Sequence, residues 1–319
     1  MPKKALVVGI DYYQEYKNLN GAVNDAYEVK SALERNGDGT RNFGIKLITS
    51  SGEDTSVARE ELRSQVEALF RDENHHTVLF YFAGHGHLDT LGSFILTSNC
   101  KHGNDGISLD EILKLANSSP AKNKIIILDC CHSGNAGSSI DLGNKSILAE
   151  GITILTASTE KQFSVEVDGK GVFTTLLVDA LNGGAANLLG QITPGSVYAH
   201  IDQSLGEWEQ RPIFKTNVKS FISLKSVNPA ISLEDLKRIT ELFEEKTFEF
   251  ELDSTYEHTS EDRIPERSEK FHVLQRYNRV NLVIPVNAAH MYDAAMESKS
   301  CKLTVLGQHY WNLVAKNTI

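Results

Sequence analysis

Two uninterrupted apolar runs stand out in the first two thirds of the chain: VLFYF at 78–82 and IIIL at 125–128. Neither run alternates with polar residues, which is typical of strands that are buried on both faces of a parallel sheet. Small and polar residues follow each run directly, AGHGH after the first and DCCHSG after the second. Because ligands and chemistry gather beyond the carboxyl ends of strands in open α/β sheets, these two stretches are the first candidates for a site.

Shorter elements surround the two runs in an alternating order. Strands are predicted at 4–11, 44–49 and 151–157, with a closing strand region in 211–224, whereas helical spacing of apolar residues appears at 22–36, 55–70, 109–117, 172–181 and 196–208. Strands that alternate with helices indicate an α/β fold, a mostly parallel sheet flanked by helices on both faces.

The composition of the chain changes at about 227–229, where VNP interrupts the pattern. Acidic side chains outnumber basic ones between 230 and 270. We expect a helix at 233–246, strands at 248–252 and 282–285, a charged loop at 263–270, and helices at 288–296 and 303–319. The sequence therefore predicts two domains, 1–226 and a small α+β accessory domain at 227–319. The acidic first half and the aromatic C-terminal helix of the second favour a partner protein over nucleic acid.

A histidine and a cysteine each follow one of the two buried runs. If the strands are neighbours, the His85 imidazole and the Cys131 thiol can meet, which is the pair that a thiolate nucleophile needs. Taken alone, Cys131 could be a structural cysteine and His85 an ordinary loop histidine. The glycines at 84 and 86 favour the catalytic interpretation of His85, because they let a substrate approach the backbone.

Two other chemistries use the same residues. A metal site built from His85, His87, Cys130, Cys131 and His132 lacks the usual C-x₂₋₄-C spacing of zinc ligands, so no metal is expected. A redox thiol pair at Cys130 and Cys131 stays open as an alternative, although adjacent cysteines are poorly placed for a disulfide.

Four segments together resemble a known family. They are ALVVGID at 5–11, LNGAVNDA at 19–26 (similar to L-x-G-C-x-N-D-A, with Ala22 where cysteine is usual), GHG at 84–86 and DCCHSG at 129–134. In this order they resemble the caspase-like cysteine peptidases, and within them the bacterial metacaspase-like proteins. The histidine precedes the cysteine by roughly 50 residues, as it does in caspases. The resemblance covers about residues 4–225.

The resemblance implies roles for individual residues. His85 is the general base, Cys131 the nucleophile, and the amides of Gly86 and Cys131 the oxyanion donors. Asp25 and Asp129, with Ser158 beside them, match positions that line a pocket for an arginine or lysine side chain. The implied function is a cysteine endopeptidase that cleaves protein substrates after Arg or Lys, in stress or defence signalling. The alternative is a non-catalytic interaction module that has kept the fold.

Calcium activates many metacaspases, but the matching positions here are depleted. Asn99 stands where the family has an acid, and only Asp105 and Asp110 remain as obvious ligands. No cofactor is therefore expected, and calcium dependence is doubtful.

The stretch 134–150 is rich in glycine and serine and is predicted to be an exposed loop. It contains one basic residue, Lys145. Since an acidic pocket accepts lysine, self-cleavage after Lys145 is one interpretation, and a passive surface loop is the other.

Bulk properties narrow the setting. The 319 residues are 40% hydrophobic and 23% charged, with a formal net charge of −10, which disfavours a generic nucleic-acid binder. No apolar run approaches the roughly 18 residues of a membrane span, and a strand begins too early to leave room for a signal peptide. The four cysteines show no disulfide framework. These features predict a reduced, cytoplasmic protein without membrane partners.

Overall fold

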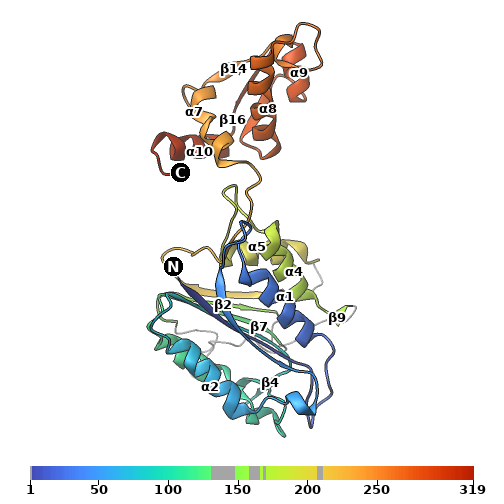
Figure 1. Ribbon diagram of the computed structural model, residues 1–319, viewed down its shortest axis with the longest axis vertical. Coiled ribbons are helices and arrows are strands. Elements are labelled where there is room, and N and C mark those ends of the chain that lie inside the picture. Colours follow the sequence, from blue (N-terminus) through green and yellow to red (C-terminus); the bar gives the residue numbers. More distant parts are fainter. Residues whose placement is uncertain (1, 131–147, 158–165, 168–169, 207–210) are drawn as a thin grey trace. The chain divides into compact units, whose positions relative to one another are not determined.

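The computed structural model describes residues 2–130, 148–157, 166–167, 170–206 and 211–319 (Figure 1). They form two compact units. The first comprises the chain up to Ala186 together with Gln191–Asn228, and the second comprises Asn187–Gly190 and Pro229–Ile319. The sequence predicts a boundary at 226/227; in the structure the second unit resumes at Pro229 and also includes the short segment Asn187–Gly190.

A six-stranded sheet forms the centre of the first unit. Its strands lie in the order β12-β8-β7-β3-β1-β2, and all neighbours are parallel except β12. The bounds are β1 Lys3–Ile10, β2 Phe43–Ser50, β3 Thr77–Ala83, β7 Asn123–Asp129, β8 Ile152–Thr156 and β12 Ile213–Asn217. The two long apolar runs are the adjacent strands β3 and β7. Both are buried along nearly their whole length, as predicted.

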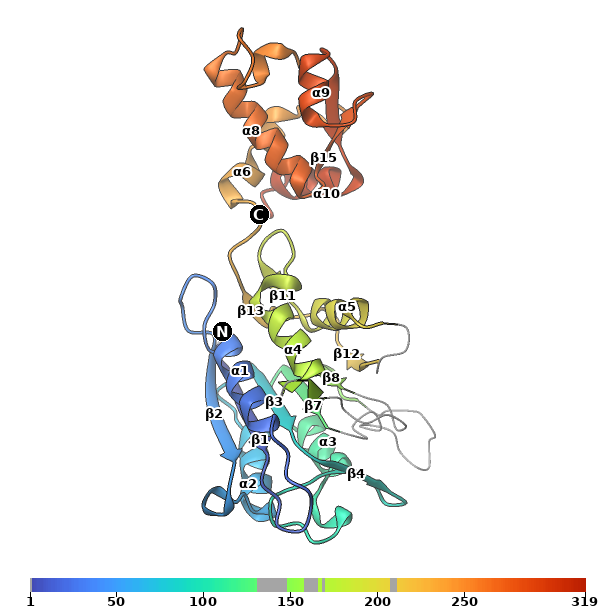
Figure 2. The same cartoon turned by 90° about the vertical axis from the view of Figure 1, so that its right-hand side faces the viewer.

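Helices cover both faces of this sheet (Figures 1 and 2). One face packs against α1 (Ala22–Glu34), α4 (Val172–Asp179) and α5 (Pro194–Ser204), and the other against α2 (Arg59–Phe70) and α3 (Leu109–Asn117). Two separate apolar cores result: the α1 core on the face covered by α1, α4 and α5, and the α2 core on the face covered by α2 and α3. Successive residues of β7 alternate between them, because side chains point to opposite faces along a strand: Ile125 and Ile127 enter the α1 core, Ile126 and Leu128 the α2 core. The predicted α/β architecture is confirmed.

Smaller elements surround the sheet. A three-stranded antiparallel sheet, β4-β5-β6, follows β3, and two-stranded sheets pair β9 with β10 and β11 with β13. The bounds are β4 Gly86–Asp89, β5 Gly92–Ile95, β6 Ile107–Ser108, β9 Glu166–Val167, β10 Lys170–Gly171, β11 Gln191–Ile192 and β13 Lys225–Ser226. Short 3₁₀ turns occupy Glu53–Thr55 and Gly103–Asp105, and a π-helical turn, Ala180–Gly184, continues α4.

The second unit has its own apolar core around a three-stranded antiparallel sheet, β14-β16-β15. Leu188 and Leu189 of the segment Asn187–Gly190 pack against this core. The bounds are α6 Leu233–Lys237, α7 Ile239–Leu242, β14 Glu249–Glu251, a 3₁₀ turn Ser254–Tyr256, α8 Pro265–Arg279, β15 Val283–Val286, α9 Met291–Met296, β16 Ser300–Leu303 and α10 Val305–Ala315.

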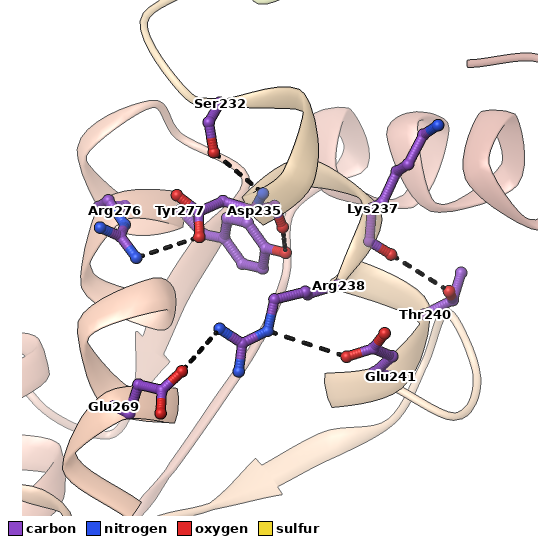
Figure 3. Close-up of polar contacts among 9 residues, drawn as sticks. All are labelled: Ser232, Asp235, Lys237, Arg238, Thr240, Glu241, Glu269, Arg276 and Tyr277. Atoms are coloured by element: carbon purple, nitrogen blue, oxygen red, sulfur yellow. Dashed lines mark hydrogen bonds and ion pairs between the residues drawn. The ribbon is translucent and has the colours of Figure 1, made fainter. Parts of the chain in front are cut away.

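A polar network joins α6 and α7 to α8 in this unit (Figure 3). The Asp235 carboxylate lies 3.1 Å from Arg276, the Tyr277 hydroxyl donates to the Asp235 carbonyl, and Arg238 lies 3.4 Å from Glu269. Burial, together with the charge of Asp235, raises the pKa of Tyr277, so this hydroxyl keeps its proton and remains a donor.

Two predictions for this unit were wrong. The single helix expected at 233–246 is two short helices, α6 and α7. The stretch 263–270, expected to be a loop, contains the start of α8, the longest helix of the unit. Charged residues dominate the exposed faces of α8 and conceal its narrow apolar stripe, Phe271, Leu274 and Tyr277.

Candidate active site

The carboxyl ends of β3 and β7 lie side by side, as the sequence interpretation required. The two strands are paired in parallel with Ala83 opposite Asp129, and the Gly84 amide donates to the Asp129 carbonyl over 3.3 Å. His85 therefore leaves one strand immediately beside the point where Cys130 leaves the other. Cys131 itself lies outside the described residues, as do His132, Lys145 and Ser158.

The loop that follows β1 holds His85. The His85 Nε2 atom lies 2.7 Å from the carbonyl oxygen of Lys17, and the His85 amide donates to the Tyr13 hydroxyl over 2.7 Å. A carbonyl oxygen only accepts, so this contact assigns the proton of the neutral imidazole to Nε2. Nδ1 then carries the lone pair, which is what a general base needs.

Sequence reasoning missed both Lys17 and Tyr13. Lys17 contributes a main-chain carbonyl, which has no sequence signature. Tyr13 did have a signal, an aromatic residue just beyond a strand that ends at the same sheet edge, and it is buried although it lies in a polar stretch.

Two buried carboxylates meet on the opposite face of the sheet. Asp25, in the first turn of α1, is 4% exposed, and Asp129, the last residue of β7, is 7% exposed. The Gly171 amide donates to Asp25 Oδ2 over 3.2 Å. A methyl group added at Gly171 would lie 2.7 Å from Asp129 Oδ2 and 3.0 Å from Asp25 Oδ2. The two acids predicted to share a pocket are therefore brought together around one glycine.

Asp25 is placed there by the start of its helix. The Asp11 carboxylate, just beyond β1, accepts the Ala22 amide over 2.9 Å and so satisfies one of the unpaired donors at the helix N-terminus. Gly9 allows the helix to approach the strand, since a Cβ there would lie 2.3 Å from the Ala22 carbonyl oxygen. Gly9 and Asp11 both belong to the segment 5–11 that was singled out in the sequence.

A chain of hydroxyl groups supports Asp129. Thr174 Oγ1, in α4, donates to Asp129 Oδ2 over 2.7 Å, and the Tyr81 hydroxyl lies 2.6 Å from Thr174 Oγ1. Because the threonine proton points to the carboxylate, the tyrosine donates to the threonine. Burial, followed by the charges of Asp129 and Asp25, raises the pKa of Tyr81 well above its usual value, so the phenol stays protonated. No pattern in the sequence marks Gly171, Thr174 or Tyr81 as site residues.

Comparison with known proteins decides the family. A family model described as the caspase domain matches residues 2–222. The chain belongs to the caspase-domain family. It is 30% identical over 156 residues to metacaspase-1 of Plasmodium falciparum (isolate 3D7), a match that covers 45% of this chain and 25% of the relative. The chain thus spans only about a quarter of the length of the curated relative that it matches.

Solved structures share the fold at low identity. Caspase-1 from Spodoptera frugiperda matches with a TM-score of 0.52 and 12% identity, over 71% of this chain and 90% of that one. A structural-genomics protein from Geobacter sulfurreducens matches with a TM-score of 0.53 and 15% identity, over 72% of this chain and 100% of that one.

In this caspase-domain protein, two of the positions considered for calcium, Asn99 and Asp105, and the acid next to Asp110, Glu111, make contacts with other protein groups. Glu111 Oε1 and Oε2 lie 2.5 Å from Arg63 Nε and 3.5 Å from Arg59 Nη2. The Asn99 side-chain oxygen accepts from the Arg59 amide over 3.2 Å, and Asp105 accepts the amides of Lys101 and His102. Two guanidinium groups beside Glu111 oppose a divalent cation there.

The other metal interpretation concerns the histidines. Within the described ranges, no group of three or more His, Cys, Asp or Glu side chains could hold a metal ion. The His87 imidazole packs on Gly103, where a Cβ would lie 2.0 Å from the ring, and Cys130 is 2% exposed in the α2 core.

Among the helices of the described segments, none has the length and apolar character to cross a membrane.

Proposed function

We propose that this caspase-domain protein is a cysteine endopeptidase that uses His85 and Cys131 to cleave protein substrates after Arg or Lys. The observation that supports this specificity best is the convergence of two buried carboxylates, Asp25 and Asp129, around Gly171. Two like charges in a buried site repel each other, and a guanidinium or ammonium group bound between them relieves that repulsion.

The chemistry follows from the orientation of His85. Nδ1 takes the proton from the Cys131 thiol while Nε2 stays bonded to the Lys17 carbonyl, which also stabilises the imidazolium that forms. The thiolate attacks the carbonyl carbon of the substrate, and the amides of Gly86 and Cys131 stabilise the oxyanion. Collapse of this intermediate releases the amine, which takes the proton from His85. Water, activated by the same imidazole, then hydrolyses the thioester.

A decisive experiment compares Cys131→Ala and His85→Ala with Cys130→Ala on Arg and Lys peptides. We expect the first two to abolish hydrolysis and Cys130→Ala to keep most of it, because Cys130 is buried in the α2 core. Members of a dyad act as a unit, so the double variant should be scarcely worse than either single variant. An active Cys131→Ala protein, or an inactive Cys130→Ala protein, would contradict the assignment of the nucleophile.

The two rival functions are distinguished by other measurements. A non-catalytic interaction module predicts no reaction of Cys131 with active-site thiol probes. A redox pair predicts a disulfide or mixed oxidation at Cys130 and Cys131, which mass spectrometry of the oxidised protein would detect. The burial of the Cys130 thiol does not favour that second rival.

Self-processing and the accessory unit complete the proposal. Cleavage after Lys145 should start a fragment at Ser146 and vanish in Cys131→Ala. If Lys145→Gln leaves both self-processing and peptide turnover unchanged, self-cleavage has no part in activation.

The second unit would recruit a partner protein in stress or defence signalling. A tight, salt-sensitive complex of the chain with duplex DNA would contradict that role.

A further inference from the structure

Tyr13 lies directly against His85, yet it belongs neither to the dyad nor to the acidic pocket. It comes three residues after the end of β1 and is 3% exposed. Its hydroxyl accepts the His85 amide over 2.7 Å, and the centroids of its ring and of the imidazole are 4.6 Å apart at an interplanar angle of 50°. One side chain thus contacts both the backbone and the ring of the proposed general base.

The His85 amide needs an acceptor because the chain has left the sheet. β3 ends at Ala83, and Gly84 has a φ of +156°, which turns the backbone out of the strand direction. The His85 carbonyl accepts from the Leu96 amide over 3.0 Å, while the amide donates to the tyrosine hydroxyl. Leaving an amide without an acceptor costs up to about 1–3 kcal/mol when it is fully buried, and the His85 amide is partly buried, so this hydroxyl helps to fix where the main chain of His85 lies.

Gly84 provides the space for the Tyr13 hydroxyl. A Cβ at Gly84 would lie 2.6 Å from Tyr13 Oη and 2.9 Å from Phe82 Cζ, closer than real contacts allow. A glycine is therefore needed at position 84 because the Tyr13 hydroxyl occupies the space that a side chain would take, in addition to any role in substrate access. The G-H-G segment at 84–86 and Tyr13 thus pack together although they are far apart in the sequence.

Tyr13 is itself anchored on the loop that carries Lys17. The Tyr13 amide donates to Asn18 Oδ1 over 2.9 Å, and the neighbouring Gln14 amide donates to the Ser98 carbonyl over 2.9 Å. The same short segment thus supplies the acceptor for the His85 amide and the acceptor for Nε2. Burial raises the pKa of the Tyr13 phenol well above its usual value, so the phenol stays neutral.

We propose that Tyr13 is a positioning residue for His85: its hydroxyl and ring hold the imidazole so that Nε2 reaches the Lys17 carbonyl and Nδ1 is left to act as the base. This inference deepens the proposed peptidase function and rests on it. Its consequence is that Tyr13 acts on proton transfer at Cys131 and leaves substrate binding unchanged.

The test compares Tyr13→Phe with Tyr12→Phe as the matched control. Tyr12 is the adjacent residue and undergoes the same chemical change, and the described residues include no contact between its ring and His85. Two quantities are measured: kcat and KM on an Arg peptide, counted per active site titrated with a thiol label, and the rate at which iodoacetamide alkylates Cys131 between pH 5 and 9. Mass spectrometry identifies the alkylated peptide, and burial slows the other cysteines, raising the pKa of Cys301 to about 12.

Tyr13→Phe should lower kcat per titrated site about tenfold, within the range that losing one buried hydrogen bond allows, and leave KM within twofold. It should also slow alkylation below pH 7 by about tenfold, because in the proposed mechanism the Cys131 thiolate forms by proton transfer to the His85 imidazole. Tyr12→Phe should match the wild type in all three quantities. If Tyr13→Phe is alkylated at the wild-type rate at pH 9, the defect lies in the proton transfer between Cys131 and His85.

Other outcomes overturn the inference. A Tyr13→Phe protein with fewer titratable sites but wild-type rates per site would show that Tyr13 only stabilises the fold. If that variant does not fold, hydrogen exchange of the wild-type His85 amide decides: rapid exchange would exclude the hydrogen bond to Tyr13, and strong protection would support it. A wild-type protein without turnover would refute the proposed function, while its alkylation profile would still test Tyr13 separately.

Discussion

The two faces of the central sheet each use a buried tyrosine hydroxyl, but the two hydroxyls bind different groups. Each face has one buried tyrosine near the carboxyl end of the strands. On the α2 face, the Tyr13 hydroxyl accepts a main-chain amide and fixes His85. On the α1 face, the Tyr81 hydroxyl donates through Thr174 to the Asp129 carboxylate. β7 serves both faces because its consecutive residues alternate: Asp129 ends it on the α1 side, and Cys130 enters the α2 core.

The difference teaches how the two functions are separated. The proposed base, His85, contacts one neutral main-chain carbonyl and one neutral tyrosine side chain. The proposed pocket instead gathers two buried carboxylates and the hydroxyl groups that support Asp129. Changes on the α1 face should therefore alter which side chain is accepted, and changes on the α2 face should alter proton transfer. The following predictions test this division.

The largest effect is expected from the pocket acids. Asp25→Asn or Asp129→Asn should reduce kcat/KM on Arg peptides by about 10²-fold or more, since removing one partner of a buried ion pair costs on the order of 3–5 kcal/mol. Parallel assays on peptides that carry citrulline in place of arginine measure the charge selectivity, which should collapse in both variants.

Asp110→Asn serves as the control because Asp110 is exposed on α3, and it should behave as the wild type. Efficient cleavage after aspartate by the wild-type protein would contradict the acidic pocket altogether.

A smaller effect is expected from Tyr81→Phe. Losing the donor to Thr174 weakens the support of Asp129 by about 1 kcal/mol, so kcat/KM on Arg peptides should fall several-fold. The pH profile of Cys131 alkylation should stay that of the wild type, which is the opposite of the expectation for Tyr13→Phe. If Tyr81→Phe instead shifts that profile, the two faces are not separate in function.

A third measurement concerns the amino end of the sheet, away from both sites. Burial lowers the pKa of Lys3 from 10.5 to about 8, although its amino group donates to Asn42 Oδ1 and to the carbonyls of Ser223 and Leu224. Between pH 8 and 10.5 the unfolded state binds more protons at this lysine than the folded state, so its contribution to the free energy of unfolding rises with pH in that window.

Urea unfolding of the wild type and Lys3→Met at pH 7.5 and 10 measures this effect. The difference between them should move in favour of the wild type as the pH rises, and kcat should not depend on it. A difference that is constant across this window would show that Lys3 keeps its ordinary pKa.

The smallest effect is expected from chelation. Because Arg59 and Arg63 lie beside Glu111, EDTA should leave peptide turnover within twofold, and added calcium should not raise it. Arg63→Ala should change the stability little, because exposed ion pairs are screened by solvent. Activation of the wild type by calcium would show that the ion binds elsewhere or displaces these arginines.

Several features of this protein were determined by local sequence. The unbroken runs at 78–82 and 125–128 are typical of strands buried on both faces, because they leave no polar face for solvent and are bounded by small and polar residues. The alternation of strands and helices then fixed the class of fold, and parallel packing brought His85 next to the end of β7. The pocket acids came from the family resemblance, and the structure placed them around one glycine.

Only the tertiary structure decided the rest. Gly171 and Thr174 lie far from Asp25 and Asp129 in the chain, and nothing in their own neighbourhood marks them as partners of buried carboxylates. The Lys17 carbonyl is invisible to sequence reasoning because every residue has one, and its use depends on where a loop passes a ring. The helix α8 was missed because its buried stripe is narrow and its other faces are charged. Hydrophobic pattern is a local property that specifies strands and their burial, whereas the partner of a buried polar group is set by which segments the packed core brings together.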